Sequence, residues 1–205
     1  MNSIIARIDN TSIFWNGTRM SYMAGFAVDC DGSPRAYHSK SSALGEDSWS
    51  SACYPDGNFQ DILACDHVGK PVVQTGLSEG EPAKDFFIAM TSYQHAKFGK
   101  YDVRRYVDAN TVPYGVINGK LRKMVPPKFL GCYGEVRNLK NGIVVPFVTA
   151  DVGPSNRVGE GSTKLVHLLG YPKASPRNGV DERVFQWSFY PGQPAKINGI
   201  TYELQ

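Results

Sequence analysis

Residues 144–170 read VVPFVTADVGPSNRVGEGSTKLVHLLG, and this stretch decides the fold class. Its first eight residues form an apolar, β-branched run, which predicts a strand that ends at Asp151. The Gly, Pro, Ser and Asn residues that follow predict a tight turn before Glu160. Ser162 then suits a helix N-cap, apolar residues recur at helical spacing, and Gly170 suits the position just past a helix end. The stretch therefore predicts a strand, a turn and a short helix.

The rest of the chain consists of short runs of strand type between turn residues, such as SIIARI at 3–8 and YGVING at 114–119. The 21 Gly, 13 Pro, 11 Tyr and 10 Phe favour strands and turns over long helices. We expect a single β-rich domain over residues 1–205, a barrel with one or two short helices. Residues 39–60, rich in Ser, Gly and Asp, are expected to form a surface loop.

Charge and hydropathy exclude few functions. The net charge of +3 permits an anionic partner without requiring one. No stretch approaches 18 consecutive apolar residues, so we expect no membrane span. The first residues, MNSIIARIDNTSIFWNG, lack the basic and apolar regions of a signal peptide. We expect a monomer.

The cysteines leave the redox state open. Four of them, Cys30, Cys53, Cys65 and Cys132, could form two disulfides in three connectivities or stay reduced. The missing signal peptide argues against an oxidising compartment.

No pattern of metal ligands stands out in the chain. The four histidines are dispersed, without HExxH or a CxxC pair. The run DCDGSP at 29–34 begins like a calcium loop, but its glycine comes too early and no glutamate closes the loop. We therefore expect no metal and no organic cofactor. Asp29 and Asp31 could still line a cleft, although a strand-ending turn is the simpler interpretation.

Other common sites are also poorly supported. GPSNRVGEGST at 153–163 faintly resembles a phosphate-binding loop, but Glu160 stands where that loop requires lysine. Basic residues are scattered, and the densest cluster, NGKLRKMVPPK at 118–128, is short, so nucleic-acid binding is not expected. No nucleophile lies in a GxSxG motif.

The carboxylates of Asp151 and Glu160 remain as candidates. A turn cap and a favourable interaction with a helix dipole would explain them without any function. A catalytic pair is the alternative, because cleavage of a glycosidic bond needs two carboxyl groups on opposite sides of the scissile oxygen. Both acids flank one short turn and could therefore face the same groove. The spacing alone favours turn capping.

A resemblance changes this balance. FVTADVGPSNRVGEGSTKLVHLLG closely resembles the motif region of glycoside hydrolase family 75, the fungal and bacterial chitosanases. Further matches, in the family's order, are AVDCDG, VVQ, YVDANTVPYGVI, GEVRNLKNG and FYPG. The portion TADVG also resembles the aspartate-bearing strand of double-psi β-barrel enzymes, including lytic transglycosylases of the MltA type.

The resemblance implies a mainly β protein with a six-stranded double-psi β-barrel, short helices and surface loops. It implies an endo-acting hydrolase that cuts β-1,4 bonds of chitosan with inversion of the anomeric configuration. The two essential acids of the family fall on Asp151 and Glu160. By analogy, Asp151 is expected to be the general acid and Glu160 the base. The residues expected to bind substrate are Asp29, Asp31, Ser155, Asn156 and Ser162.

Two alternatives stay open. Chitosan is polycationic and the chain is basic, so a glycosidase of peptidoglycan, delivered outside the cytoplasm, would suit the charge better. A non-catalytic polysaccharide-binding barrel is the third possibility. For a chitosanase we expect acids around Asp151 and Glu160, with Asp108 as a further candidate. A basic lining would favour peptidoglycan, with these candidates: Lys120, Arg122, Lys123 and Arg157. Either polymer implies action outside the cytoplasm.

Overall fold

The computed structural model describes residues 3–48, 58–125 and 128–205. The chain separates into two compact units, one formed by Met1–Asp29 and Thr111–Gln205 and the other by Cys30–Asn110. The single domain expected over 1–205 stays a prediction, and the loop-rich stretch after Asp29 buries apolar clusters of its own. Each unit is described by itself.

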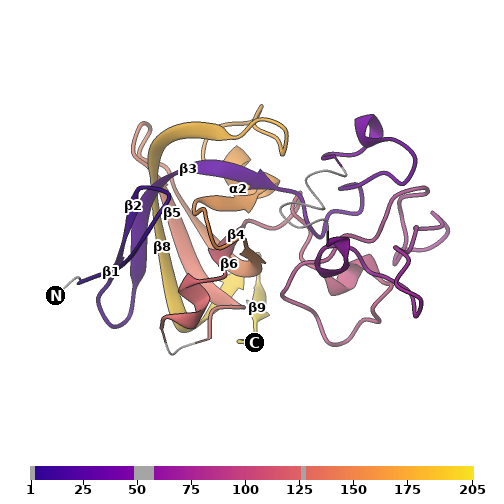
Figure 1. Ribbon diagram of the computed structural model, residues 1–205, viewed down its shortest axis with the longest axis horizontal. Helices are drawn as coiled ribbons and strands as arrows, with labels where there is room; N and C mark the ends of the chain where they lie inside the picture. Colours follow the sequence, from indigo (N-terminus) through magenta and orange to yellow (C-terminus); the bar gives the residue numbers. More distant parts are fainter. Residues whose placement is uncertain (1–2, 49–57, 126–127) are drawn as a thin grey trace. The chain divides into compact units, whose positions relative to one another are not determined.

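The first unit is a closed six-stranded β-barrel, as predicted (Figure 1). Its strands follow the order β3-β7-β4-β6-β5-β8, and pairing of β3 with β8 closes the barrel. The pairs β3–β7 and β4–β6 are parallel and join strands that are not consecutive in sequence, so crossover connections link them. The strands are β3 (Met20–Asp29), β4 (Tyr114–Asn118), β5 (Cys132–Asn138), β6 (Val144–Gly153), β7 (Glu160–Ser162) and β8 (Val180–Ile197).

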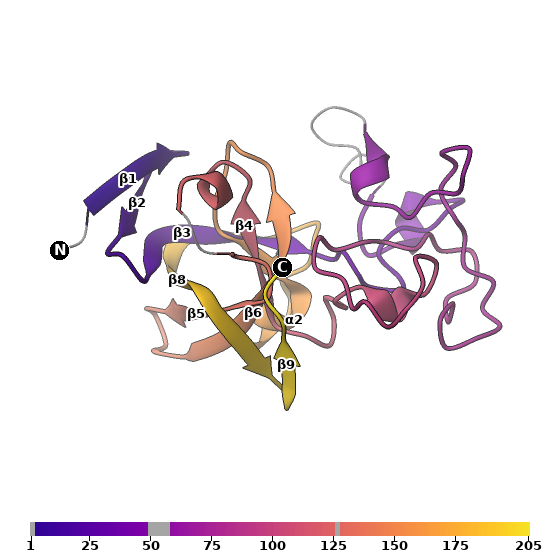
Figure 2. The same ribbon diagram turned by 90° about the horizontal axis from the view of Figure 1, so that it is seen from below.

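Short strands extend the barrel at both edges of the sheet. The strands β1 (Ser3–Ile8) and β2 (Thr11–Trp15) form a hairpin that continues from β3 (Figure 2), and β9 (Ile200–Tyr202) pairs with the end of β8. Asp9 and Asn10 make the hairpin turn with φ of 47° and 55°. Asp and Asn tolerate this left-handed region, which a two-residue turn of this hand requires at both positions.

The barrel core is aromatic. Alternate residues of β3 from Met20 to Val28 are buried, the period-two pattern of a strand with one face on the core. The ring of Phe147 fills the space beside two glycines, since a Cβ added to Gly115 or Gly134 would lie 2.4 or 2.2 Å from it. The rings of Trp187 and Phe189 pack against the same residue. The glycines thus make room for a large side chain between β4, β5 and β6.

The predicted helix is present as α2 (Thr163–Leu168). Ser162 is its N-cap and accepts a hydrogen bond from the Leu165 amide, which confirms the predicted cap. Gly170 follows the helix with φ of 99°, a conformation that favours glycine. No helix among the described residues is long and apolar enough to cross a membrane.

The second unit, Cys30–Asn110, has little regular structure. Its described elements are isolated β-bridges and short 3₁₀ helices over Ser42–Leu44, Phe59–Asp61 and Val103–Arg105. Two small apolar clusters, one with Leu63 and Phe87 and one with Ile88 and Tyr106, form its core. Part of the surface loop expected at 39–60 lies outside the described residues.

Three cysteines are buried free thiols: Cys30, Cys65 and Cys132. Burial raises the pKa of the Cys132 thiol to about 12. Cys53 lies outside the described residues. The structure therefore describes no disulfide among these three cysteines.

Candidate active site

Asp151 owes its position to an irregularity in β6. Thr149 pairs with Gly115 and Asp151 pairs with Val116, so Ala150 is an extra residue between them. With strict alternation Asp151 would face the core, as Phe147 does, but the bulge turns it to the face of Val116. Ile117 belongs to the barrel core and Val116 does not, so this is the face outside the core cluster. Asp151 is buried, with 8 % of the residue exposed, and its Oδ1 accepts a hydrogen bond from the Val152 amide at 2.7 Å.

Glu160 reaches the same place from the other side of β4. As the first residue of β7 it pairs with Val116, so its side chain shares the face of Asp151. Its side chain is 14 % exposed. A Cβ on Gly153 would lie 2.8 Å from Glu160 Oε2, so Gly153 leaves the space that this carboxylate occupies. The two predicted catalytic acids therefore flank one residue of β4.

The backbones of Asp151 and Glu160 are two strand spacings apart. Since β6 and β7 lie on opposite sides of β4, two interstrand spacings put their Cα atoms about 10 Å apart. Inverting glycosidases hold their carboxyl groups roughly 6.5–9.5 Å apart, which leaves room for a water molecule. The strand spacing thus sets the separation of the two backbones, from which both side chains leave on the same face of the sheet.

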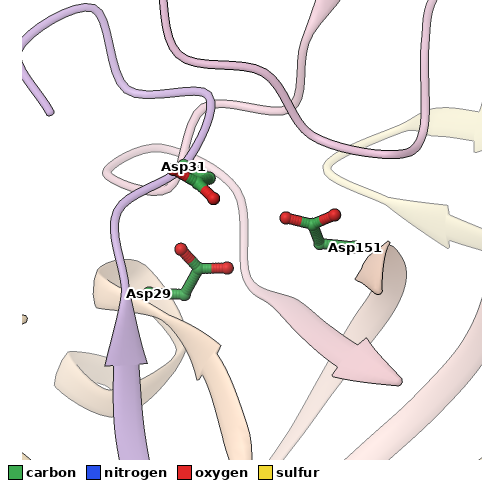
Figure 3. Close-up of side chains that lie close together, drawn as sticks. All are labelled: Asp29, Asp31 and Asp151. Atoms are coloured by element: carbon green, nitrogen blue, oxygen red, sulfur yellow. The ribbon is translucent and has the colours of Figure 1, made fainter. Parts of the chain in front are cut away.

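A third acid of the barrel, Asp29, lies close to Asp151. It is the last residue of β3, and its carboxylate lies within 4.8 Å of that of Asp151. Figure 3 shows the two carboxylates pointing toward each other. Sequence reasoning expected Asp29 to bind substrate but gave no sign of this proximity, because β3 and β6 are far apart in the chain.

Asp31, which Figure 3 also labels, is the second residue of the other unit. There it accepts a hydrogen bond from the hydroxyl of Tyr37 at 2.9 Å. Asp108 belongs to that unit as well. Their suggested places in the substrate site stay predictions.

Burial decides the proton affinity of Glu160. Its pKa is raised to about 7, chiefly because the side chain is removed from water, and the negative charge of Asp29 acts in the same direction. The guanidinium of Arg157, whose Nη2 lies 2.9 Å from Glu160 Oε1, opposes this increase. A carboxyl group with this pKa keeps much of its proton near neutral pH, as a general acid must. Glu160 thus holds a proton that it could donate, whereas the analogy had assigned the part of the acid to Asp151, and which of the two has that part stays a prediction.

The turn between the two acids is held by a residue that sequence reasoning missed. The side chain of Asn118, at the end of β4, donates hydrogen bonds to the carbonyls of Pro154 and Arg157, both at 2.8 Å. The predicted binding residues Ser155 and Asn156 lie between them and are exposed at the tip of the turn. The only signal in the sequence was an Asn-Gly pair after a strand, which predicts a turn and no long-range contact.

Ser162 does not suit its predicted role in substrate binding. Its side chain is fully buried, and its Oγ accepts hydrogen bonds from the amides of Tyr114 and Leu165 and donates one to the carbonyl of Val112. These bonds fix the start of α2 against β4. We therefore do not retain Ser162 among the binding residues.

The close carboxylates of Asp29 and Asp151 are the described barrel residues that could attract a hard cation. Acid pairs with this spacing occur both with and without a bound ion, so we assign no metal to them.

Comparison with known proteins gives no family: no protein-family model matches the chain, and no curated protein matches it significantly. What the chain does is therefore inferred from the site itself.

Proposed function

We propose that this chain is an endo-acting glycoside hydrolase that cuts β-1,4 bonds of an amino-sugar polysaccharide, with chitosan as its substrate. The observation that supports this most is the arrangement of Asp151 and Glu160 on either side of Val116, on one face of the sheet. A turn cap requires no second carboxylate across a strand. Two carboxyl groups that can lie on either side of one glycosidic bond are the minimum apparatus for its hydrolysis.

The raised pKa of Glu160 supports Glu160 as the general acid and Asp151 as the general base. Glu160 in its protonated form donates its proton to the glycosidic oxygen as the bond to the anomeric carbon breaks. Asp151 accepts a proton from a water molecule, whose oxygen bonds to the anomeric carbon from the opposite face. The products are two shorter chains, and the configuration at the attacked carbon is inverted. Solvent then returns the proton from Asp151 to Glu160.

Asp29 supports an amino sugar as the substrate. Its carboxylate adds negative charge beside Asp151 and Glu160, and the ammonium group of a deacetylated sugar is attracted to such a group. Two unit charges 4 Å apart attract each other by about 4 kcal/mol at an effective dielectric constant of 20. This is enough to favour a cationic sugar over a neutral one.

A peptidoglycan glycosidase is the second candidate, and the guanidinium of Arg157 beside Glu160 favours it. Arg157 is 45 % exposed, so it could also bind a carboxylate of a substrate. Lys120, Arg122 and Lys123 are exposed and follow Asn118 directly on the chain. Peptidoglycan carries carboxylates and chitosan does not, so these side chains suit it better.

The test is incubation of the purified chain with chitosan, chitin and peptidoglycan at low ionic strength, with analysis of the released ends. We expect new reducing ends from chitosan, fewer as salt is added, because salt screens the attraction between polymer and acids. Release from peptidoglycan instead would establish the second candidate. Binding without release from any polymer would reject both and point to a non-catalytic barrel.

A further inference from the structure

Asn118 uses the whole hydrogen-bonding capacity of its side-chain amide. Its Nδ2 donates to the carbonyls of Pro154 and Arg157 at 2.8 Å each. Its Oδ1 accepts from the amides of Lys120 and Leu121 at 2.9 and 3.1 Å. An amide side chain has two donor hydrogens and two acceptor lone pairs, so all four are used. The residue is 3 % exposed, which makes the loss of any of these bonds costly.

The two carbonyls that Asn118 holds bracket the turn that carries Arg157. A further bond, from the Gly119 amide to the Gly153 carbonyl at 3.1 Å, fixes the start of the same turn. A half-exposed arginine on a free loop would form only a weak ion pair, because ordering a long side chain costs entropy. A turn that is fixed on both sides lowers that cost for the contact between Arg157 and Glu160.

We propose that Asn118 is a positioning residue that holds the turn at 154–157 so that Arg157 stays against Glu160. Asn118 does not touch Glu160 and acts only through Arg157. Its effect on turnover rests on the proposed function, whereas its effect on the proton affinity of Glu160 does not.

Several charged or titratable groups face Glu160 or lie on the elements beside it. Arg157 comes from the turn, and Asp29 and Tyr22 come from β3. The negative charge of Glu160 helps to raise the pKa of Tyr22. Asp151 lies on the same face of β6, and β4 contributes the uncharged Val116. The helix α2 carries Lys164 and His167, and the ring of His167 is bonded to the Ala174 carbonyl. Among these groups Arg157 is the one that opposes the raised pKa of Glu160.

The test is a titration of the Glu160 carboxyl carbon by NMR in the full chain labelled with ¹³C-glutamate, with Glu160→Gln to assign the signal. Arg157→Gln should raise the pKa of Glu160 because a nearby positive charge is lost. Asn118→Leu, a neutral change of similar size, should raise it in the same direction and to a similar extent. The double variant should titrate like Arg157→Gln, since the effect of Asn118 passes through Arg157.

The matched control is Asn138→Leu. Asn138 is another buried asparagine of the barrel, with Nδ2 bonded to the Leu169 carbonyl and Oδ1 to the Lys140 amide at 2.9 and 3.0 Å. Its loss should lower stability and leave the titration of Glu160 unchanged. Where Asn118→Leu does not fold, Asn118→Ser replaces it, because a hydroxyl can still accept one of the two amide bonds.

An Asn118 variant that titrates like the wild type would overturn the proposal, and so would an equal shift in Asn138→Leu. The titration needs no substrate. If the expected shifts occur in a chain that cuts no polysaccharide, the proposed function fails and the positioning role stands. If the chain is active and the shifts are absent, the reverse holds.

Discussion

Asp151 and Glu160 lie on opposite sides of β4, nine residues apart in sequence and opposite the same residue, Val116. The chain leaves β6 after Gly153, turns past the end of β4, and returns as β7 along the other edge of that strand. The spacing of the two acids is therefore the length of turn needed to pass from one neighbour of β4 to the other.

The first prediction concerns the two acids. Asp151→Asn and Glu160→Gln should each reduce hydrolysis by ~10²–10⁴ or more, because each removes a group that must transfer a proton. Circular dichroism and the thermal midpoint should show a folded chain. Asp181→Asn and Glu203→Gln make the same chemical changes at exposed positions and should keep full activity. A Glu160→Gln variant with near-normal kcat would remove Glu160 from the mechanism.

The second prediction concerns pH. Because the pKa of Glu160 is raised to about 7, the general acid loses its proton as pH rises through that value. The value of kcat/KM should therefore decline above neutral pH with this apparent pKa. A profile that stays level to pH 9 would show that Glu160 is not the acid.

The third prediction concerns stability. A carboxyl whose pKa is higher in the folded chain than in the unfolded chain binds its proton more tightly when folded, so stability falls as pH rises from about 4.5 to about 7. Glu160→Gln removes this loss. We therefore compare the thermal midpoint of Glu160→Gln with that of the wild type at two pH values. The difference in favour of the variant should be several degrees larger at pH 8 than at pH 4, since a chain of this size gains roughly 2–4 °C per kcal/mol. An equal difference at both pH values would contradict the raised pKa.

The fourth prediction concerns Asp29. Its negative charge raises the pKa of Glu160, so Asp29→Asn should lower that pKa and move the alkaline limb of the rate profile to lower pH. As a group that attracts an ammonium sugar, Asp29 should also affect KM on chitosan more than kcat. Loss of kcat to the extent seen in Asp151→Asn would instead make Asp29 part of the catalytic apparatus.

The fifth prediction concerns the barrel. Gly134→Ala would place a methyl group within 2.2 Å of the Phe147 ring, so it should destabilise the fold by about 1–3 kcal/mol. The double variant Gly134→Ala/Phe147→Leu should recover part of this loss, because leucine leaves space for the methyl group. A double variant that is less stable by the sum of the two single effects would show that Phe147 is not the obstacle.

Local features of the chain were predictable because local chemistry determines them. The strand that leads to Asp151, the Ser162 cap and the position of Gly170 follow from side-chain type and spacing, and the structure has all three, although β6 continues past Asp151 to Gly153. The raised pKa of Glu160 was not predictable, since the burial of its side chain depends on Gly153 and on strands far away in sequence. Nor was the bulge at Ala150, which no special residue marks.

Asp29 and Asn118 show the same limit. Each lies beside groups that only the topology brings near: Asp151 for the first and the carbonyls of the turn at 154–157 for the second. A strand-ending aspartate and an Asn-Gly pair have ordinary local explanations, which are correct as far as they go. The division of the chain into two units likewise depends on which apolar residues meet, not on a linker visible in the sequence.

The most direct test of the central claim is the configuration of the first product. Proton NMR of a chitosan oligosaccharide digest, recorded within minutes of adding the chain, distinguishes α from β reducing ends before they equilibrate. Two carboxyl groups on either side of β4 predict α reducing ends, because a single inversion at a β-1,4 bond gives the α configuration. The variants Asp151→Asn and Glu160→Gln should give no product. Initial β ends would contradict this account and favour a closer pair such as Asp29 and Asp151, and the absence of any product would contradict hydrolysis itself.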